Sequence, residues 1–155
     1  TTIRPFNTYG PRQSARAVIP AIITQALTQN QIRIGNLDTR RDFTYIADTI
    51  QGFLTAADTP GVEGRTFNLG TGQDITIGHL ANLIIQRINP ALTLVSDPVR
   101  MRPEKSEVYR LISDNALARS TLGWQPQVGI AQGLDQTIAW IRNHLDLYRP
   151  GTYEF

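Results

Sequence analysis

Arginine supplies nearly all the positive charge of this chain, and arginine is suited to binding phosphate groups. Lys105 is the single lysine among 15 cationic side chains in 155 residues. A guanidinium grips a phosphate through two parallel hydrogen bonds, whereas an ammonium acts as a point charge. A coding bias toward arginine explains the ratio equally well. An arginine is therefore a candidate anion ligand only where a motif places it.

Other reactive residue types are scarce, which excludes several classes of site. The chain has no cysteine, so disulfides, thiol catalysis and cysteine-based zinc sites are excluded. Its two histidines, His79 and His144, are far apart in sequence, and we expect no metal site. The net charge is +2. The isoelectric point of about 9.3 is the one hint of nucleic-acid binding, and no basic-aromatic motif supports it.

The length and composition predict one ordinary globular unit. Hydrophobic residues make up 41% of the chain and charged residues 18%. No apolar run approaches the roughly 18 residues of a membrane helix, and no signal peptide opens the chain, so we expect a cytoplasmic location without membrane contact. The chain begins at Thr1 in an extended run without an initiating methionine, which suggests a piece of a longer protein.

Strand and helix patterns alternate along the chain, which favours an α/β fold. The predicted strands are 1–6, 32–34, 41–44, 65–69 and 92–95, and the predicted helices are 15–29, 46–57, 76–88, 115–122 and 130–145. Thr76 and Asp114 are suitable N-caps, and Gly123 suits the position after a helix end. Residues 97–107 have no regular spacing of apolar side chains and are expected to form a loop. Residues 148–155 are expected to form a tail.

The chain lacks the two motifs of a complete dinucleotide-dependent enzyme. No glycine set forms G-x-G-x-x-G, because Ile75 stands where Gly70 and Gly72 would need a third glycine. A Tyr-x-x-x-Lys pair is also absent, since Met101 stands four residues before Lys105. We predict no catalytic residue in this chain, and no turnover by the chain alone.

Four ordered motifs resemble those of the extended short-chain dehydrogenases/reductases, the family of nucleotide-sugar epimerases and dehydratases. They are Arg4-Pro-Phe-Asn-Thr-Tyr-Gly-Pro-Arg-Gln13, Arg41-Asp-Phe-Thr-Tyr-Ile-Ala-Asp48, Phe67-Asn-Leu-Gly-Thr-Gly72 and, after Asp114 and Ala118, Leu122-Gly-Trp-Gln-Pro126. The resemblance implies that residues 1–155 form a single α/β substrate-binding lobe, the C-terminal half of the enzyme. The opening strand would belong to the Rossmann sheet of the missing half, which would hold most of the NAD or NADP. The full-length enzyme would be a homodimer.

The resemblance also assigns site residues, position by position. Asn7, Arg41 and Arg102 match the residues that hold the diphosphate of a nucleotide sugar, and we expect them to converge in space. Glu107 could accept a hydrogen bond from a ribose hydroxyl. The resemblance also suggests a base pocket lined by Val18, Ile19 and Pro20. The same residues would serve equally well as helix core.

Several further residues receive structural or accessory roles. Phe6 and Tyr9 lie near where the family brings nicotinamide and substrate together, but packing explains both. Arg12 and Arg16 could add positive charge around the diphosphate. Asp42 is expected to be a charge partner of nearby arginines. Asp48 is expected to take part in a hydrogen bond within a helix turn. We expect core positions for Trp124 and Trp140.

The loop Arg102-Pro-Glu-Lys-Ser-Glu-Val108 is similar to that of bacterial nucleotide-sugar 4,6-dehydratases that serve surface-polysaccharide and nonulosonic acid pathways. The reaction implied by the resemblance is oxidation of the sugar at C4 by NAD(P), loss of water across C5 and C6, and return of the hydride to C6. A 4-epimerase of the same family and a binding module without catalysis remain open alternatives.

Overall fold

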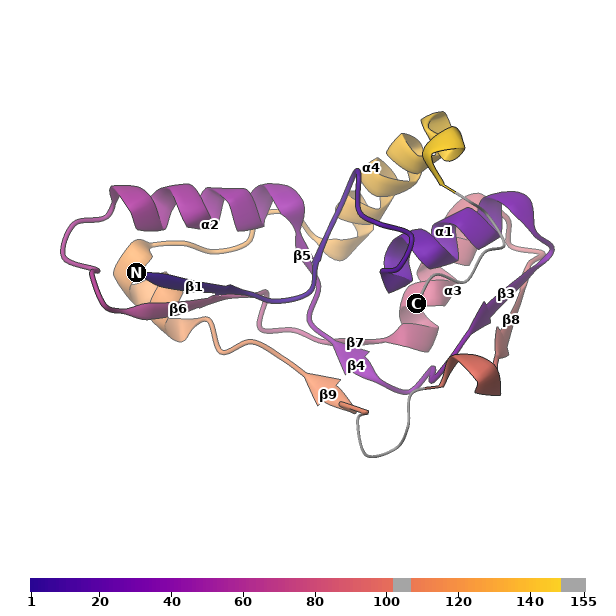
Figure 1. Cartoon of the computed structure of the whole chain (residues 1–155), viewed down its shortest axis with the longest axis horizontal. Helices are drawn as coiled ribbons and strands as arrows, with labels where there is room; N and C mark the ends of the chain where they lie inside the picture. The colour runs from indigo at the N-terminus through magenta and orange to yellow at the C-terminus, as the bar shows by residue number, and fades with distance from the viewer. Residues whose placement is uncertain (102–106, 149–155) are drawn as a thin grey trace.

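The computed structural model describes residues 1–101 and 107–148, and it confirms the α/β class (Figure 1). The strands are β1 (Thr2–Pro5), β2 (Thr8–Tyr9), β3 (Gln31–Ile34), β4 (Arg40–Arg41), β5 (Thr44–Tyr45), β6 (Thr66–Leu69), β7 (Ile75–Thr76), β8 (Thr93–Ser96) and β9 (Arg110–Leu111). The helices are α1 (Val18–Thr28), α2 (Ile46–Asp58), α3 (Ile77–Ile88) and α4 (Ile130–Asn143). Short turns form η1 (Pro98–Arg100), η3 (Ala118–Leu122) and η4 (Leu145–Leu147).

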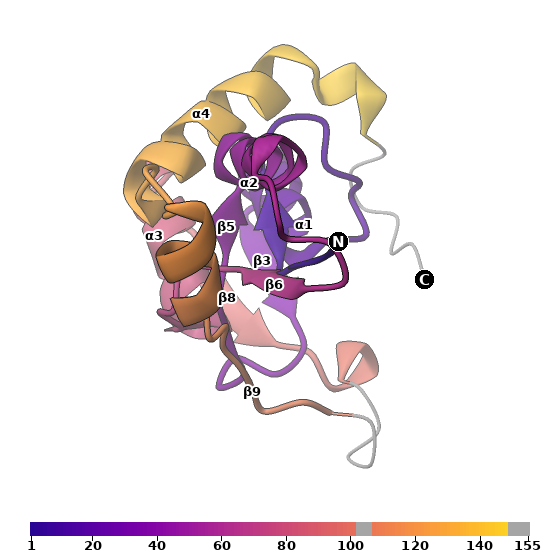
Figure 2. The same ribbon diagram turned by 90° about the vertical axis from the view of Figure 1, so that its left-hand side faces the viewer.

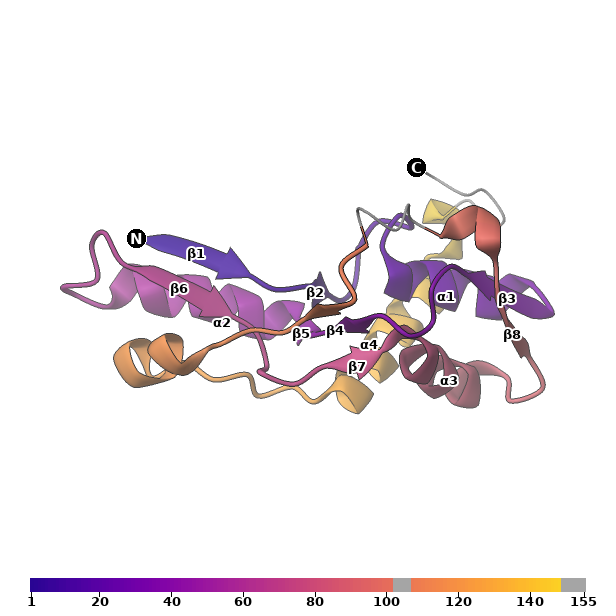
Figure 3. The same ribbon diagram turned by 90° about the horizontal axis from the view of Figure 1, so that it is seen from below.

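The strands form small sheets that follow one another along the molecule (Figure 3). Three pairs are parallel: β1 with β6, β2 with β5, and β3 with β8. Between them, β4 pairs antiparallel with β7 and parallel with β9. Parallel neighbours need a crossover, which explains why helices separate the strands in sequence. The segment after β1 meets the segment after β4, because the N–H of Thr44 donates to the carbonyl oxygen of Asn7 at 3.2 Å.

Two separate apolar clusters hold these elements together. The larger one joins α1, α3 and α4, and its fully buried members include Ile22, Leu80 and Leu134. The smaller one lies between α2, β6 and η3 and contains Phe67 and Trp124 (Figure 2). The core position expected for Trp124 is confirmed. Trp140 is only partly buried and packs against the edge of the larger cluster.

At one end of the molecule, β1 has a strand partner on one side only among the described residues, and α2 exposes apolar side chains. Among the strands of the described residues, only β6 pairs with β1. Beside this pair, α2 leaves Ile50, Phe53 and Leu54 about half exposed, at 51%, 48% and 55%. Parallel sheets are normally covered on both faces, so a two-stranded parallel sheet of this kind is marginal by itself.

Local signals placed most element ends correctly. The backbone N–H of His79 donates to the Thr76 hydroxyl at 3.1 Å, so the predicted N-cap is confirmed. Gly123 has φ 64°, the left-handed conformation predicted for it. Helix α1 begins at Val18 rather than near residue 15, which places Pro20 in the first turn, where proline is tolerated.

Three segments differ from expectation. The predicted strand 41–44 is divided into β4 and β5, with residues 42–43 outside any strand. Within 97–107, Asp97 accepts a hydrogen bond from the N–H of Val99 and starts the turn η1, because an aspartate before a proline can organise a turn without any apolar period. The predicted helix 115–122 takes a wider π form over Ala118–Leu122. Residues 102–106 and most of the predicted tail lie outside the described residues.

No helix in the two described stretches combines the length and apolarity needed to cross a membrane.

Candidate functional site

A cavity of about 490 Å³ lies between α1, the end of β3, β4 and the segment that leads into β9. Its volume is within the range of small-molecule sites. Among the described residues, four arginines and one acid line it: Arg16, Arg33, Arg41, Arg100 and Glu107. This excess of guanidinium groups gives the cavity the donors and the charge to hold an anion.

Most residues predicted for the substrate come together at this cavity. Asn7, Arg41 and Glu107 all line it, although they come from three separate parts of the chain. Arg102 lies outside the described residues, so its predicted place beside Arg41 stays a prediction. Arg100 and Glu107, which flank that segment, both line the cavity.

Arg41 is held in place at the cavity wall by an acid and by its own strand. Its Nη2 lies 3.4 Å from Oε1 of Glu107, and the two side chains are only 14% and 9% exposed. Its Nη1 donates to the carbonyl oxygen of Arg40 at 2.9 Å. The separation from Glu107 is long for a charge-assisted hydrogen bond, so an entering phosphate can compete with this carboxylate.

The predicted base-pocket residues lie at the same cavity but not all in its wall. Val18 and Ile19, at the start of α1, line the cavity. Pro20 is buried in the same helix and is not among the residues lining this cavity. Ile19 is 1% exposed, so it serves the core as well as the wall.

Phe6 and Tyr9 occupy different environments. Phe6 lines a neighbouring hollow at the end of β1, which shares Asn7, Thr8 and Leu111 with the main cavity. Tyr9 is 2% exposed, and its hydroxyl donates to the carbonyl oxygen of Ile130 at 3.4 Å. Burial raises the pKa of Tyr9, with smaller effects from its neighbours, so the phenol stays neutral. The structure thus gives Tyr9 a packing role.

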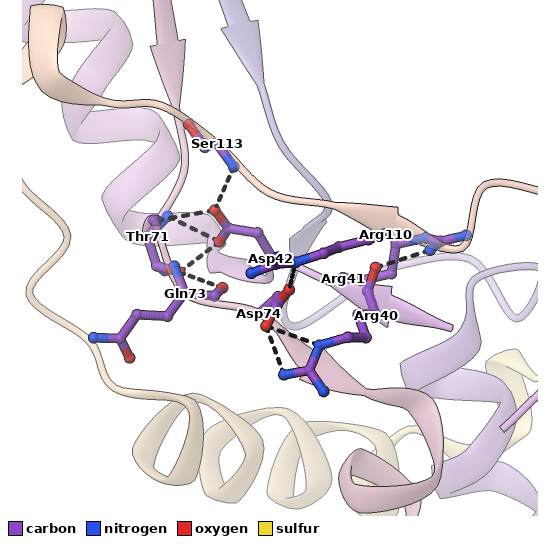
Figure 4. A network of polar contacts seen from close by, with 9 residues as sticks. Arg40, Arg41, Asp42, Thr71, Gln73, Asp74, Arg110 and Ser113 are labelled. Atoms are coloured by element: carbon purple, nitrogen blue, oxygen red, sulfur yellow. Dashed lines mark hydrogen bonds and ion pairs between the residues drawn. The ribbon is translucent and has the colours of Figure 1, made fainter. Parts of the chain in front are cut away.

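The role predicted for Asp42 as a charge partner of arginines is wrong. Its carboxylate is fully buried and accepts hydrogen bonds from the N–H groups of Thr71, Gly72 and Ser113 and from the Thr71 hydroxyl (Figure 4). A buried carboxylate can be satisfied by neutral donors without a cationic partner, and here the turn after β6 and Ser113 after β9 supply them.

Asp48 also differs from its predicted role, because its partners lie outside its own helix. It accepts hydrogen bonds from the N–H groups of Gln127 and Val128, both at 3.0 Å, in the loop before α4. Its carbonyl oxygen accepts the indole N–H of Trp124 at 2.9 Å. Asp48 therefore ties α2 to a distant loop.

The turn Gly70-Thr71-Gly72 does not fit the phosphates of a dinucleotide. The amide N–H groups of Thr71 and Gly72 already donate to Asp42. A Cβ built on Gly70 would lie 2.3 Å from Cβ of Ser113, so the space beside it is filled. A pyrophosphate there would meet a buried carboxylate, and the cofactor phosphates must therefore bind to other residues.

No group of three or more histidine, aspartate or glutamate side chains in residues 1–101 and 107–148 is arranged to hold a metal ion.

Sequence reasoning missed Gln25 and Arg33, which face the cavity together. The side-chain oxygen of Gln25 accepts the N–H of Arg33 at 2.9 Å, and its amide donates to the Arg33 carbonyl at 3.3 Å. Gln25 is only 6% exposed. A glutamine on the apolar side of a predicted helix was the available signal, because a buried amide needs specific partners.

A second missed network lies outside the cavity, where Asp74 joins Arg40 on β4 to Arg110 on β9 (Figure 4). These hydrogen bonds lower the pKa of Asp74 from its usual 3.8 to about 2. A folded-state pKa below the unfolded value stabilises the protein above about pH 4, and that contribution disappears as the pH falls through 2.

We therefore expect the melting temperature of the wild type to fall more steeply than that of Asp74→Asn between pH 4 and pH 2. Circular dichroism melts at pH 7, 4 and 2 would measure it. Parallel curves for the two proteins would contradict the assignment of this pKa to the ion pairs.

Comparison with known proteins identifies the family. A family model described as GDP-mannose 4,6 dehydratase matches residues 1–137. The chain is 33% identical over 137 residues to a GDP-6-deoxy-D-mannose reductase of Pseudomonas aeruginosa, covering 84% of the chain and 44% of that protein. It is 32% identical over 145 residues to a UDP-glucose 4-epimerase of Mycolicibacterium smegmatis, covering 91% of the chain and 45% of that protein.

The fold comparison agrees. A structure of UDP-glucuronic acid 4-epimerase from Bacillus cereus, in complex with UDP-glucuronic acid and NAD, superposes with a TM-score of 0.82 at 26% identity. The match covers 91% of this chain and 44% of that one. The chain thus spans a little under half the length of the proteins it matches. Its four motifs were interpreted correctly: the chain belongs to the GDP-mannose 4,6-dehydratase family within the extended short-chain dehydrogenases/reductases.

Proposed function

We propose that the cavity between α1 and β4 binds a nucleotide sugar, with Asn7 and Arg41 at its diphosphate. The observation that carries this proposal is that these two side chains, from distant motifs, line one cavity that also contains Arg16, Arg33 and Arg100. Nucleotide sugars present two adjoining phosphates, which match a cluster of planar guanidinium donors. Arg102, the third predicted ligand, would join the cluster from the neighbouring segment.

The rest of the ligand would extend in two directions from the diphosphate. Val18 and Ile19, which line the cavity, would contact the base. Glu107 would accept a hydrogen bond from a ribose hydroxyl once the Arg41 guanidinium turns to the phosphate. The hollow beside Phe6 adjoins the cavity at Asn7 and Leu111 and would take the sugar. Ligands of parallel sheets characteristically bind at the carboxyl ends of strands, where β1 ends at Pro5.

For the complete enzyme we propose an NAD(P)-dependent nucleotide-sugar 4,6-dehydratase, with a 4-epimerase as the second candidate. The matching family model supports the first, and the Mycolicibacterium relative supports the second. The cofactor would be held mainly by residues outside this chain, because the turn at Gly70 does not fit it. The contribution of this chain is to grip the nucleotide, which orients the distant sugar for reaction.

The proposal is tested by calorimetric titration of the protein with UDP, GDP, dTDP and CDP, each compared with its monophosphate. We expect at least one diphosphate to bind, and to bind more tightly than its monophosphate because both phosphates face arginines. Failure of all four diphosphates to bind would overturn the assignment of the cavity.

The reaction is tested with the full-length enzyme and the matching nucleotide sugars. A dehydratase gives a product lighter by one water, whereas an epimerase gives a product of unchanged mass, so mass spectrometry separates the two candidates. We expect the 155-residue chain alone to give neither product.

A further inference from the structure

Asp42 lies directly behind the proposed anion site without lining its cavity. Its neighbours in sequence, Arg41 and Phe43, both face the cavity. Asp42 lies between them but does not line the cavity, because its carboxylate is directed to Thr71, Gly72 and Ser113. Its fully buried position and its partners therefore need an explanation other than ligand contact.

We propose that Asp42 is a positioning residue. It holds the side chains of Asn7 and Arg41 in the relative positions that allow both to contact one anion. The inference rests on the proposed nucleotide-sugar site and names the group that organises it. Asp42 itself touches no phosphate.

The side chain of Asp42 joins three segments that are distant in sequence. One carboxylate oxygen accepts the N–H of Thr71 at 2.9 Å and also its hydroxyl. The other oxygen accepts the N–H groups of Gly72 at 3.0 Å and Ser113 at 3.1 Å. The turn after β6 and the chain leaving β9 are thus fixed to the strand that carries Arg41 (Figure 4).

The backbone of Asp42 connects this anchor to the cavity wall. Its carbonyl oxygen accepts the side-chain amide of Asn7 at 3.0 Å, which fixes the orientation of that amide. Its N–H donates to the carbonyl oxygen of Leu111, another cavity residue, at 3.0 Å. A movement of Asp42 would therefore displace Asn7, Arg41 and Leu111 together.

An asparagine cannot replace this carboxylate. Four donors converge on two oxygens, and ionised aspartate is a pure acceptor. The amide of Asp42→Asn would direct an NH₂ group at N–H donors, leaving buried groups without partners. We expect the turn at Thr71 and the strand at Arg41 to move apart.

Asp48 provides a matched control. It is also buried, at 5% exposure, and also accepts two backbone N–H groups, those of Gln127 and Val128. It lies in α2 and is not among the residues lining the cavity. Asp48→Asn should therefore destabilise the protein without altering the anion site.

The experiment uses the full-length protein and measures the dissociation constants of GDP and UDP by calorimetry, at a temperature where every variant is folded. For the diphosphate that binds the wild type, we expect Asp42→Asn to raise the dissociation constant about tenfold, the size of one charge-assisted hydrogen bond. We expect Asp48→Asn to leave it within about twofold. In turnover assays Asp42→Asn should raise KM more than it lowers kcat.

A second readout separates this inference from the proposed function. The NMR signals of the Asn7 side-chain amide and the Arg41 Nε–H should shift in Asp42→Asn and stay in place in Asp48→Asn. If the wild type bound neither of these nucleotides nor dTDP or CDP, the proposed function would fall, while these signals would still decide whether Asp42 positions both side chains. Unchanged signals, or equal losses of affinity in the two variants, would overturn the inference.

A milder substitution covers the case in which Asp42→Asn does not fold. Thr71→Ala keeps every backbone donor to Asp42 and removes the Thr71 hydroxyl that donates to it, together with the γ-methyl group and the hydroxyl's contacts with Gln73. It should weaken nucleotide binding about threefold and shift the same two NMR signals in the same direction. Unchanged binding with unchanged signals would count against Asp42.

Discussion

Replacing Arg41 with alanine is expected to raise the dissociation constant of a bound nucleoside diphosphate about hundredfold, because a bidentate guanidinium contact is among the strongest polar contacts available to a phosphate. The side chain is largely buried in the cavity wall, where Glu107 and the carbonyl oxygen of Arg40 hold the guanidinium in place. Calorimetric titration of the variant with the preferred diphosphate measures the effect. Affinity for the matching nucleoside, which has no phosphate, should change much less.

The neighbouring Arg40 offers a matched control. It has the same chemistry and adjoins Arg41 in β4, yet it pairs with Asp74 and is not among the residues lining the cavity. Arg40→Ala should leave the dissociation constant within about threefold of the wild type. Equal losses in both variants would mean that general positive charge, rather than placement in the cavity, attracts the ligand.

The second large effect concerns stability. Phe67 is fully buried in the smaller apolar cluster, and Phe67→Ala is expected to destabilise the protein by about 3–5 kcal/mol through lost burial and the cavity left behind. Because this cluster contains few side chains and β1 has one described neighbour, we expect the loss to fall first on β1, β6 and η3. Native-state hydrogen exchange would show their amides losing protection while those of α1 and α3 keep it.

Ile84→Ala is the corresponding change in the larger cluster, where Ile84 is also fully buried. It should lower protection in α1, α3 and α4 before it affects β6. Loss of protection throughout the chain in both variants, by equal amounts, would show that the two clusters unfold as one unit.

Local chemistry explains why so much of the fold could be predicted from the sequence. Thr76 and Gly123 act within a few residues of themselves, so an N-cap and a left-handed helix end are visible in a short window. Helices α2, α3 and α4 have clear apolar periods, and their predicted positions are close to the observed ones. The π turn of η3 has no comparable local pattern.

Only part of the candidate site could be predicted, because a sequence motif identifies a residue but not the distant residues that contact it in the fold. Asn7, Arg41 and Glu107 were placed at one site by the resemblance, and the structure brings them to one cavity. The partners of Asp42 at Thr71 and Ser113 lie far along the chain and depend on the tertiary fold. No sequence window contains that information.

The pair Arg40 and Arg41 has a consequence for insertions and deletions in the preceding loop. Loss of one residue there would exchange the two faces of β4, yet an arginine would still stand on each side of the strand. The two following residues would also exchange faces, which would turn Phe43 toward the backbone donors that now hold Asp42, and Asp42 toward the cavity. The two arginines therefore do not distinguish the correct register of the strand from the shifted one. Asp42 and Phe43 do, because each would enter an environment that does not suit its side chain.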